Sequence, residues 1–346
     1  MRRGDFKPQC LATAVGSMPQ INPQLAVRTL LRHLPEIPVW PQLPHRGFSE
    51  SMYVQFTERF PGVVLEDERI YVDRNANVDD ALAQLYVAYL ENNIEYGRVS
   101  PEFASGLYAL LSAEVPARVA VKGQVIGPIS WGLTVTDQDR RPVLYDDVLA
   151  DALAKHLRLK AAWQESQLAR ISPDTILFVD EPYMSSFGSA FVSVSREQVV
   201  SLLDEVFAGI NGLRGVHCCG NTDWSVLLAT NADILSFDAY SYAETIALYP
   251  AELGAFLGSG GVLAWGIVPN TAEALAHEDA ASLQARLEAA MAALERKGIS
   301  REVLIDQCLI TPCCGLQGLK PETATQALAL TRELSLRLRE AYVKER

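Results

Sequence analysis

Short apolar runs alternate along the chain with longer segments in which apolar residues recur at helical spacing. The apolar runs are bounded by turn-forming residues and have the length of buried strands, whereas the segments between them are amphipathic and rich in Ala, Leu, Glu and Arg. Strands that alternate with helices predict a parallel sheet covered by helices. The predicted strands are 12–16, 37–42, 119–126, 175–179, 215–219, 233–237, 262–267 and 308–311, and the main predicted helices are 145–170, 196–210, 271–297 and 321–339.

Eight strands in this order predict an α/β fold of the (β/α)8 TIM barrel type, formed by residues 1–346 as a single catalytic domain. An open doubly wound sheet would give a similar pattern. The barrel is favoured because the chemically unusual residues fall at the carboxyl ends of the predicted strands, where barrel active sites lie. The stretch 44–116 is too long for one connection, so we predict an insertion after the second strand, with a helix near 78–93, that forms a lid or side wall.

Composition and charge exclude several classes of protein. With 49% hydrophobic and 21% charged residues, the chain has the composition of a globular protein with a large core. The net charge of −12 and the absence of a Lys/Arg stripe argue against nucleic-acid binding. No apolar run approaches the roughly 20 residues of a membrane span, and no apolar stretch follows the Met-Arg-Arg start. The expectation is a cytoplasmic protein without membrane or nucleic-acid partners.

The cysteines indicate a metal site rather than disulfide bonds. Four of the six form adjacent pairs in apolar segments, which is not the spacing of a disulfide framework. His217 and Cys219 are two residues apart on a predicted strand, so both side chains point to the same side and Cys218 to the other. Zinc prefers nitrogen and sulfur ligands, and a catalytic site keeps a fourth position open.

Cys314, at the end of the last predicted strand, would complete a set of three protein ligands. The alternative is that these cysteines are small buried apolar residues. Metal binding is favoured because the His-x-Cys pair and Cys314 each end a strand and are each followed by Gly. Cys218 and Cys313 are predicted to be packing residues.

Five motifs together resemble a known family. In chain order they are Ala-Thr-Ala-Val-Gly-Ser-Met-Pro at 12–19, Val-Lys-Gly-Gln-Val-Ile-Gly-Pro at 121–128, Val-Asp-Glu-Pro at 179–182, His-Cys-Cys at 217–219 and Thr-Pro-Cys-Cys-Gly-Leu at 311–316. They resemble the catalytic C-terminal domain of cobalamin-independent methionine synthase in a short "core" form, within the uroporphyrinogen decarboxylase/methionine synthase-like superfamily. The segment 217–221 is also similar to the zinc motif of corrinoid-linked thiol methyltransferases.

This resemblance implies one zinc ion per chain, with His217, Cys219 and Cys314 as ligands. The family's fourth ligand is a Glu after the next strand, and Asp238 stands at that place. Its side chain is one methylene shorter. A ligand role for Asp238 and a role in capping the following helix therefore stay open.

The resemblance also implies a homocysteine site. The amine would lie near Asp180, the carboxylate of the catalytic site, and the substrate carboxylate near Gly16 and Ser17. A carboxylate suits an ammonium group and backbone N–H groups suit an anion, so the chemistry agrees with these roles. The alternative is that both segments are turn and cap residues.

Two departures from the family bear on substrate and donor. A second amine-binding carboxylate after the second strand has no clear counterpart, and Gln42 and Glu50 are the candidates to replace it. The family also places a His, in the role of general acid, after the seventh strand, where this chain reads Gly-Ile-Val-Pro-Asn at 266–270. A methyl-folate donor needs protonation of its leaving group, whereas a methyl-corrinoid does not.

The sequence therefore predicts a zinc-dependent methyltransferase that converts homocysteine to methionine, with methylcobalamin or a methylated corrinoid protein as donor. One alternative is a corrinoid-linked methyltransferase acting on another thiol such as coenzyme M. Another is a non-catalytic zinc-binding subunit of a corrinoid protein complex. A uroporphyrinogen decarboxylase is disfavoured because 15–27 lacks the Arg residues that would bind many carboxylates.

Overall fold

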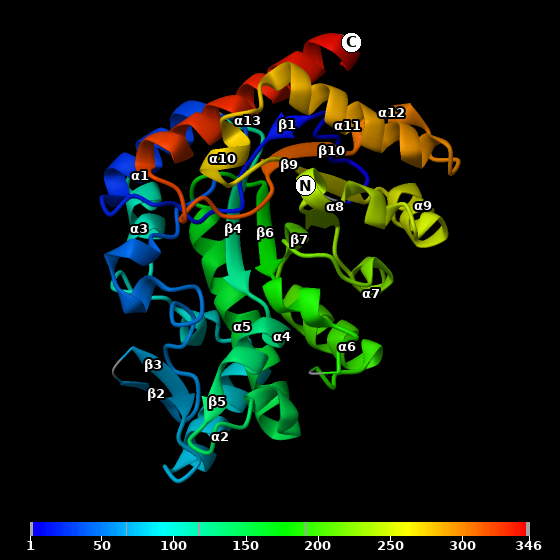
Figure 1. The fold of residues 1–346 in the computed structure, drawn as a ribbon. Helices are drawn as coiled ribbons and strands as arrows, with labels where there is room; N and C mark the ends of the chain where they lie inside the picture. The colour runs from blue at the N-terminus through cyan, green and yellow to red at the C-terminus, as the bar shows by residue number, and fades with distance from the viewer. Residues whose placement is uncertain (1–2, 67, 117, 191, 344–346) are drawn as a thin grey trace.

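The computed structural model describes residues 3–66, 68–116, 118–190 and 192–343. Its main feature is a curled parallel sheet of seven strands in the order β1-β10-β9-β8-β7-β6-β4 (Figure 1). These strands overlap seven of the eight predicted ones, so the alternating pattern of the sequence is confirmed as an α/β fold. The strands are β1 (Leu11–Ala12), β4 (Val121–Ile126), β6 (Thr175–Asp180), β7 (Leu213–Cys218), β8 (Ile234–Phe237), β9 (Val262–Val268) and β10 (Cys308–Pro312).

The predicted second strand, 37–42, is not a regular strand. It touches both edges of the sheet through isolated bridges, Val39 with Lys122 of β4 and Gln42 with Ser17 after β1. The Trp40 N–H donates to the Lys122 carbonyl oxygen at 3.4 Å, and the Gln42 N–H to the carbonyl oxygen of residue 16 at 3.1 Å. The regular sheet is therefore a seven-stranded half-barrel, and the predicted closed barrel of eight strands is not confirmed.

Beside β4, a side-chain amide makes the hydrogen bonds that the backbone of a regular neighbouring strand would make. The Gln164 amide, on helix α5 (Asp147–Leu168), accepts from the Gln124 N–H and donates to the Gln124 carbonyl oxygen, both at 3.0 Å. The Trp40 indole N–H also donates to Gln164, at 2.9 Å. Gly123 leaves room for this amide, since a Cβ there would lie 2.1 Å from Gln164 Oε1. The Trp40 carbonyl oxygen accepts from the Gln124 side-chain amide at 3.2 Å, so the segment does not continue the backbone ladder.

Helices cover the outside of the sheet, and α5, α6 (Arg196–Phe207) and α13 (Pro321–Tyr342) match the predicted segments 145–170, 196–210 and 321–339. The predicted helix 271–297 is two helices, because Asp279 begins the second with a capping box. Among the described residues, none of the helices combines the length and apolar character that crossing a bilayer requires. The other helices are α1 (Pro23–His33), α4 (Pro128–Thr134), α6 (Arg196–Phe207), α7 (Trp224–Leu228), α8 (Ala239–Ile246), α9 (Pro250–Gly258), α10 (Ala272–Leu275), α11 (Ala280–Glu295), α12 (Arg301–Asp306) and α13 (Pro321–Tyr342).

The inserted stretch 44–116 has structure of its own. Its strands β2 (Val63–Glu66) and β3 (Arg69–Val72) pair antiparallel, and β5 (Thr136–Asp137) from outside the stretch joins β3. The predicted helix near 78–93 is present as α2 (Val78–Leu90), which packs on α5. Figure 1 shows this small sheet and α2 at the end of the molecule toward which β4 and β6 point. The stretch also contains α3 (Ser105–Leu111) and the short 3-10 turns η1 (Pro44–Arg46), η2 (Phe48–Glu50) and η3 (Ile94–Gly97).

The concave side of the curled sheet changes from apolar to polar along each strand. Ile176 and Phe178 of β6, with Leu213 of β7 and Ile234 of β8, belong to one buried apolar cluster. Nearer the carboxyl ends, the same side of these strands carries the polar residues Asp180, His217 and Ser236, with Gly215 between Leu213 and His217 on β7. Because side chains alternate along a strand, this change brings polar side chains together at the carboxyl ends of parallel strands.

Candidate metal centre

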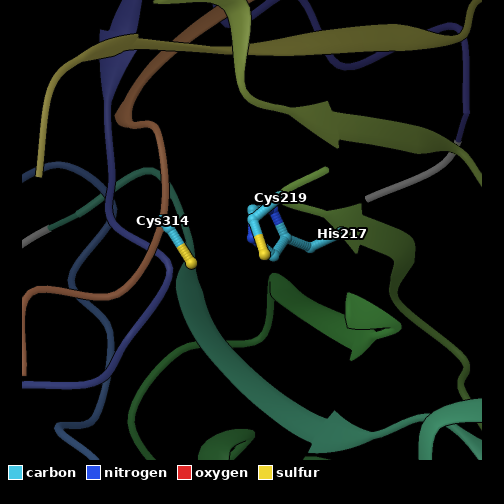
Figure 2. Close-up of side chains that lie close together, drawn as sticks. All are labelled: His217, Cys219 and Cys314. Atoms are coloured by element: carbon cyan, nitrogen blue, oxygen red, sulfur yellow. The ribbon is translucent and has the colours of Figure 1, made fainter. Parts of the chain in front are cut away.

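His217, Cys219 and Cys314 lie together at this end of the sheet. Their possible ligand atoms, one from each side chain, all lie within 4.8 Å of one another. His217 is near the end of β7, Cys219 follows that strand, and Cys314 comes from the turn after β10. Figure 2 shows the Cys314 sulfur pointing toward the other two side chains. The structure thus gathers the three residues that the sequence singled out as metal ligands.

The His217 ring is oriented by Ser236. Its Nδ1 lies 2.9 Å from the Ser236 Oγ, and the two residues are partners in the ladder between β7 and β8. Its Nε2 is buried and has no hydrogen-bond partner among the described residues. An unpartnered buried nitrogen costs roughly 1–3 kcal/mol, so it calls for a ligand. A histidine with one nitrogen hydrogen-bonded and the other free is the arrangement of a metal ligand, so the residues present fit a zinc ion.

The two cysteines differ in their electrostatic surroundings. The hydrogen bond from Cys314, and then the His217 imidazole, lower the pKa of Cys219 to about 4, although burial opposes this. The same contact raises the pKa of Cys314 well above the usual value of a thiol. These surroundings favour the thiolate form at Cys219, and thiolates are the sulfur ligands that zinc binds.

The neighbouring cysteines have a different role. Cys218 and Cys313 are buried, and burial raises the pKa of each thiol to about 12. The Cys218 thiol donates to the carbonyl oxygen of Gly220 at 3.4 Å, and the Cys313 thiol to Asn270 Oδ1 at 3.2 Å. Both thiols pack in the interior, as predicted, and for Cys218 the alternation of side chains along β7 gives the reason.

Asp238 caps a helix. Its Oδ1 accepts from the Ser241 N–H at 2.8 Å and begins α8, which follows β8. Burial raises the pKa of Asp238, and the negative charge of Cys219 raises it further. The carboxylate is therefore near the centre but is not one of the three residues whose ligand atoms converge. The cap contact is observed, and a ligand role for Asp238 stays a prediction.

Two adjacent carboxylates, Asp180 and Glu181, lie at the end of β6, and Glu181 is fully engaged. It accepts hydrogen bonds from the N–H groups of Ile129 and Ser130, at 2.9 and 2.7 Å, and from the Ser130 hydroxyl at 2.6 Å. Gly127 makes room for it, because a Cβ there would lie 2.1 Å from Glu181 Oε1. Burial raises the pKa of Glu181 to about 7. Glu181 therefore joins β6 to the start of α4 and is not free to bind a ligand.

Asp180, in contrast, has an oxygen without a partner. Its Oδ1 is buried and accepts no hydrogen bond from the described residues. Burial raises the pKa of Asp180, whereas His217 and the buried Lys122 ammonium lower it. Lys122 donates to the carbonyl oxygen of Val15 at 2.8 Å and lies 4.2 Å from the centre of the Phe178 ring. Asp180 is thus a buried acceptor held near the metal ligands.

Gly16 and Ser17 follow β1 and lie near the turn after β10. Gly16 has a φ of 141°, and a Cβ there would lie 2.8 Å from the Gln124 amide, so only glycine fits. The Ser17 carbonyl oxygen accepts from the Leu316 N–H at 2.8 Å, and a Cβ built on Gly315 would lie 3.0 Å from the Ser17 Cβ. Ser17 therefore lies beside the turn that carries Cys314.

Gln42 and Glu50, the two candidates to replace the family's second amine-binding carboxylate, differ in their contacts. Glu50 accepts from the Arg46 Nε at 2.7 Å and from the Ser105 hydroxyl at 2.5 Å, so it is engaged within the insertion. Gln42 accepts from the Ser17 hydroxyl at 3.1 Å and so lies beside Ser17. Sequence reasoning missed Ser236 altogether, although the period of two along β8 places it on the same side as Asp238.

Comparisons with models of known families and with curated proteins give no match. Solved structures do match over nearly the whole chain. A B12-independent methionine synthase from Shewanella sp. W3-18-1, in complex with selenomethionine, gives a TM-score of 0.58 at 16% identity and covers 96% of this chain and 98% of its own. A methyltransferase from Methanosarcina mazei gives a TM-score of 0.57 at 15% identity and covers 95% and 94%. The chain shares the fold of these two proteins, which fits the resemblance found in the sequence.

Proposed function

We propose that this protein is a zinc-dependent methyltransferase that transfers a methyl group to the thiol of homocysteine. One zinc ion per chain would be held by His217, Cys219 and Cys314. The proposal rests on the buried Nε2 of His217, which has no hydrogen-bond partner among the described residues and lies within reach of two cysteine sulfurs. When bound there with an open position, zinc would lower the pKa of a coordinated substrate thiol and orient its sulfur for attack on a methyl group.

The protein's own groups bind and orient the substrate. Ser236 holds the His217 ring so that Nε2 is the ligand atom. The free oxygen of Asp180 would accept a hydrogen bond from the substrate ammonium, and the backbone at Gly16 and Ser17 would bind the carboxylate. Burial keeps water from competing for these contacts, so each is stronger than it would be in water. The fold shared with a B12-independent methionine synthase supports this reading.

For the methyl donor we propose methylcobalamin or a methylated corrinoid protein. Chain length does not select the donor, because the Shewanella protein, described as B12-independent, is matched over 98% of its length. The support is the site itself: Asn270, in the segment where the resemblance places a general acid, donates to the carbonyl oxygen of Gly315 at 3.3 Å. An amide cannot protonate a leaving group, and a departing reduced cobalt needs no proton.

The alternatives keep the metal centre and change its use. A methyltransferase acting on another thiol such as coenzyme M would need the same zinc chemistry, but its sulfonate would be repelled by the free carboxylate of Asp180. A non-catalytic zinc-binding subunit of a corrinoid protein complex would not need an open metal position. Of the thiol substrates, the carboxylate of Asp180 favours one that also carries an amine, because an ammonium group would be attracted to it.

The test compares wild type with Cys314→Ala and with the matched control Cys313→Ala, whose thiol packs next to the site. Zinc content and methyl transfer to homocysteine from methylcobalamin and from methyl-folate are measured. We expect one zinc per chain and methionine formation in the wild type and in the control, and neither in Cys314→Ala. Efficient transfer from methyl-folate alone would overturn the donor assignment. Zinc binding without homocysteine turnover from either donor would overturn the proposed substrate.

A further inference from the structure

Lys122 is a fully buried lysine on the concave side of β4. Its ammonium group donates to the carbonyl oxygen of Val15 at 2.8 Å and lies 4.2 Å from the centre of the Phe178 ring. Moving a charge from water into the interior of a protein is costly unless neighbouring groups compensate it. We therefore expect this lysine to have a role that an apolar side chain of the same size could not fill.

The Lys122 side chain extends along the sheet toward the candidate metal centre. Lys122 is the register partner of Ile176 on β6, but its ammonium group lies over Phe178, two residues further along that strand. Asp180, with its unpartnered oxygen, is two residues further again and on the same side. At about 3.3 Å per residue, the level of Phe178 is roughly 7 Å before that of Asp180. The positive charge therefore lies at the floor of the site.

The concave side of β4 supports the segment that follows β1. Lys122 and Gln124 are two residues apart on β4, so their side chains point to the same side. Lys122 bonds to the Val15 carbonyl oxygen, and the Gln124 amide packs against Gly16, where a Cβ would lie 2.8 Å from it. Val15 and Gly16 come directly before Ser17. The Lys122 ammonium is thus bonded to the backbone that leads into the proposed carboxylate-binding residues.

Lys122 keeps its charge at neutral pH although it is buried. Burial lowers the pKa of Lys122 to about 8, and the opposite charge of Asp180 raises it. The lysine therefore remains mostly protonated at pH 7. Since a charge in the interior is weakly screened, its attraction reaches further than it would in water. The floor of the site thus carries a positive charge that acts on any anion bound above it.

We propose that Lys122 is a positioning residue that selects thiols carrying a carboxylate. Its hydrogen bond to Val15 holds the segment before Gly16 in place. Its positive charge attracts the carboxylate toward the backbone N–H groups of Gly16 and Ser17. This inference rests on the proposed function and narrows its substrate to thiols with an acidic group.

The alternative is that Lys122 only balances the charge of Asp180. Both explanations require a positive charge at position 122, but they differ in which part of a ligand responds when it is removed. If Lys122 acts on the substrate carboxylate, its loss weakens the binding of thiols that carry a carboxylate. If Lys122 only balances Asp180, its loss changes the contribution of the substrate amine and leaves that of the carboxylate unchanged.

The test measures thiol binding without a methyl donor. In protein loaded with Co²⁺ in place of zinc, thiolate coordination changes the visible absorption, and dissociation constants follow from titration. The ligands are homocysteine, 3-mercaptopropylamine, which lacks the carboxylate, and 4-mercaptobutyrate, which lacks the amine. The ratio of the constants for 3-mercaptopropylamine and homocysteine gives the carboxylate preference, and the ratio for 4-mercaptobutyrate and homocysteine gives the amine preference. A general loss of packing or metal would change all three constants in the same direction.

Wild type should bind homocysteine more tightly than 3-mercaptopropylamine. We expect Lys122→Met to reduce this carboxylate preference by about tenfold, a typical effect of losing one interaction with a charged group. Lys122→Gln should reduce it as well, because an amide can donate to the Val15 carbonyl oxygen but carries no charge. Lys160→Met is the matched control and should keep the wild-type preference. Lys160, on α5, is also fully buried, and it donates to the Arg98 carbonyl oxygen in the insertion at 2.9 Å.

The outcomes separate this inference from the proposed function. If wild type binds none of the three thiols to the metal, the proposed function fails. If it binds them and the Lys122 variants keep the carboxylate preference, the thiol site stands and the role of Lys122 is refuted, including the case in which only the amine preference changes. A preference lost in Lys122→Met but kept in Lys122→Gln would refute the role of the charge. Cobalt stoichiometry of one per chain shows that a variant is folded at the site, and either Lys122 variant that meets this condition decides the question.

Discussion

Replacing Ser236 with alanine is the sharpest test of how the metal centre is built. Ser236 is 1% exposed, and its Oγ lies 2.9 Å from His217 Nδ1. Ser236→Ala removes this contact and leaves the three proposed ligands in place. The imidazole then has no partner that fixes which nitrogen carries the proton or how the ring is turned.

The size of the effect can be worked out in two ways. Leaving the buried Nδ1 group unpaired costs about 1–3 kcal/mol. Removing the partner that orients a metal-binding histidine lowers metal affinity by about 10- to 100-fold, which corresponds to about 1.4–2.7 kcal/mol. The two ranges agree, so we expect zinc affinity to fall by one to two orders of magnitude.

Zinc affinity is measured by competition with a chromophoric chelator. Ser236→Thr retains the hydroxyl and should bind zinc nearly as well as wild type. Thr13→Val is the matched control for the loss of a buried hydroxyl, because the Thr13 Oγ donates to the Ile37 carbonyl oxygen at 3.0 Å and contacts no proposed ligand. An affinity of Ser236→Ala within twofold of wild type would refute the argument that Ser236 orients the ligand.

Three further predictions concern the interior. Burial lowers the pKa of His156 to about 3, so this side chain stays neutral in the native state at a pH where it takes up a proton in the unfolded chain. The free energy of unfolding should therefore fall by about 1.4 kcal/mol per pH unit as the pH drops below about 6.5. His156→Gln should remove this contribution to the slope in urea titrations between pH 4.5 and 6.5. Gly215→Ala would place a Cβ 2.1 Å from the Phe178 ring and should cost about 1–3 kcal/mol by urea denaturation, with recovery when Phe178→Leu is added; no recovery would contradict the steric cause. Cys218→Ala should leave zinc stoichiometry unchanged, because that thiol faces Gly220, and loss of zinc would show that the ligand set is wrong.

The sequence by itself determined the elements and the candidate ligands that follow from local periodicity. Alternating apolar runs and amphipathic segments located seven parallel strands and their helices, because burial on both faces of a parallel strand leaves a continuous apolar run. The period of two along a strand placed His217 and Cys219 on one side and Cys218 on the other. These inferences need only neighbouring residues, so they do not depend on the tertiary fold.

Only the tertiary structure decided which distant side chains meet. Cys314 reaches His217 because β10 and β7 end at the same edge of the curled sheet. Register between neighbouring strands pairs His217 with Ser236, which no local pattern predicts.

The same holds where side chains replace backbone contacts. The sequence pattern of residues 37–42 predicts a strand. In the structure, however, the backbone N–H and carbonyl oxygen of Gln124 on β4 bond to the Gln164 side chain, which lies more than 120 residues from this segment in sequence. Gln42 donates to Gln55, and Gln55 donates to the Phe103 carbonyl oxygen, contacts that exist only because the insertion folds against Gln42. Sequence patterns specify which faces are buried, whereas hydrogen bonds between distant segments depend on distances and directions that exist only in the folded chain.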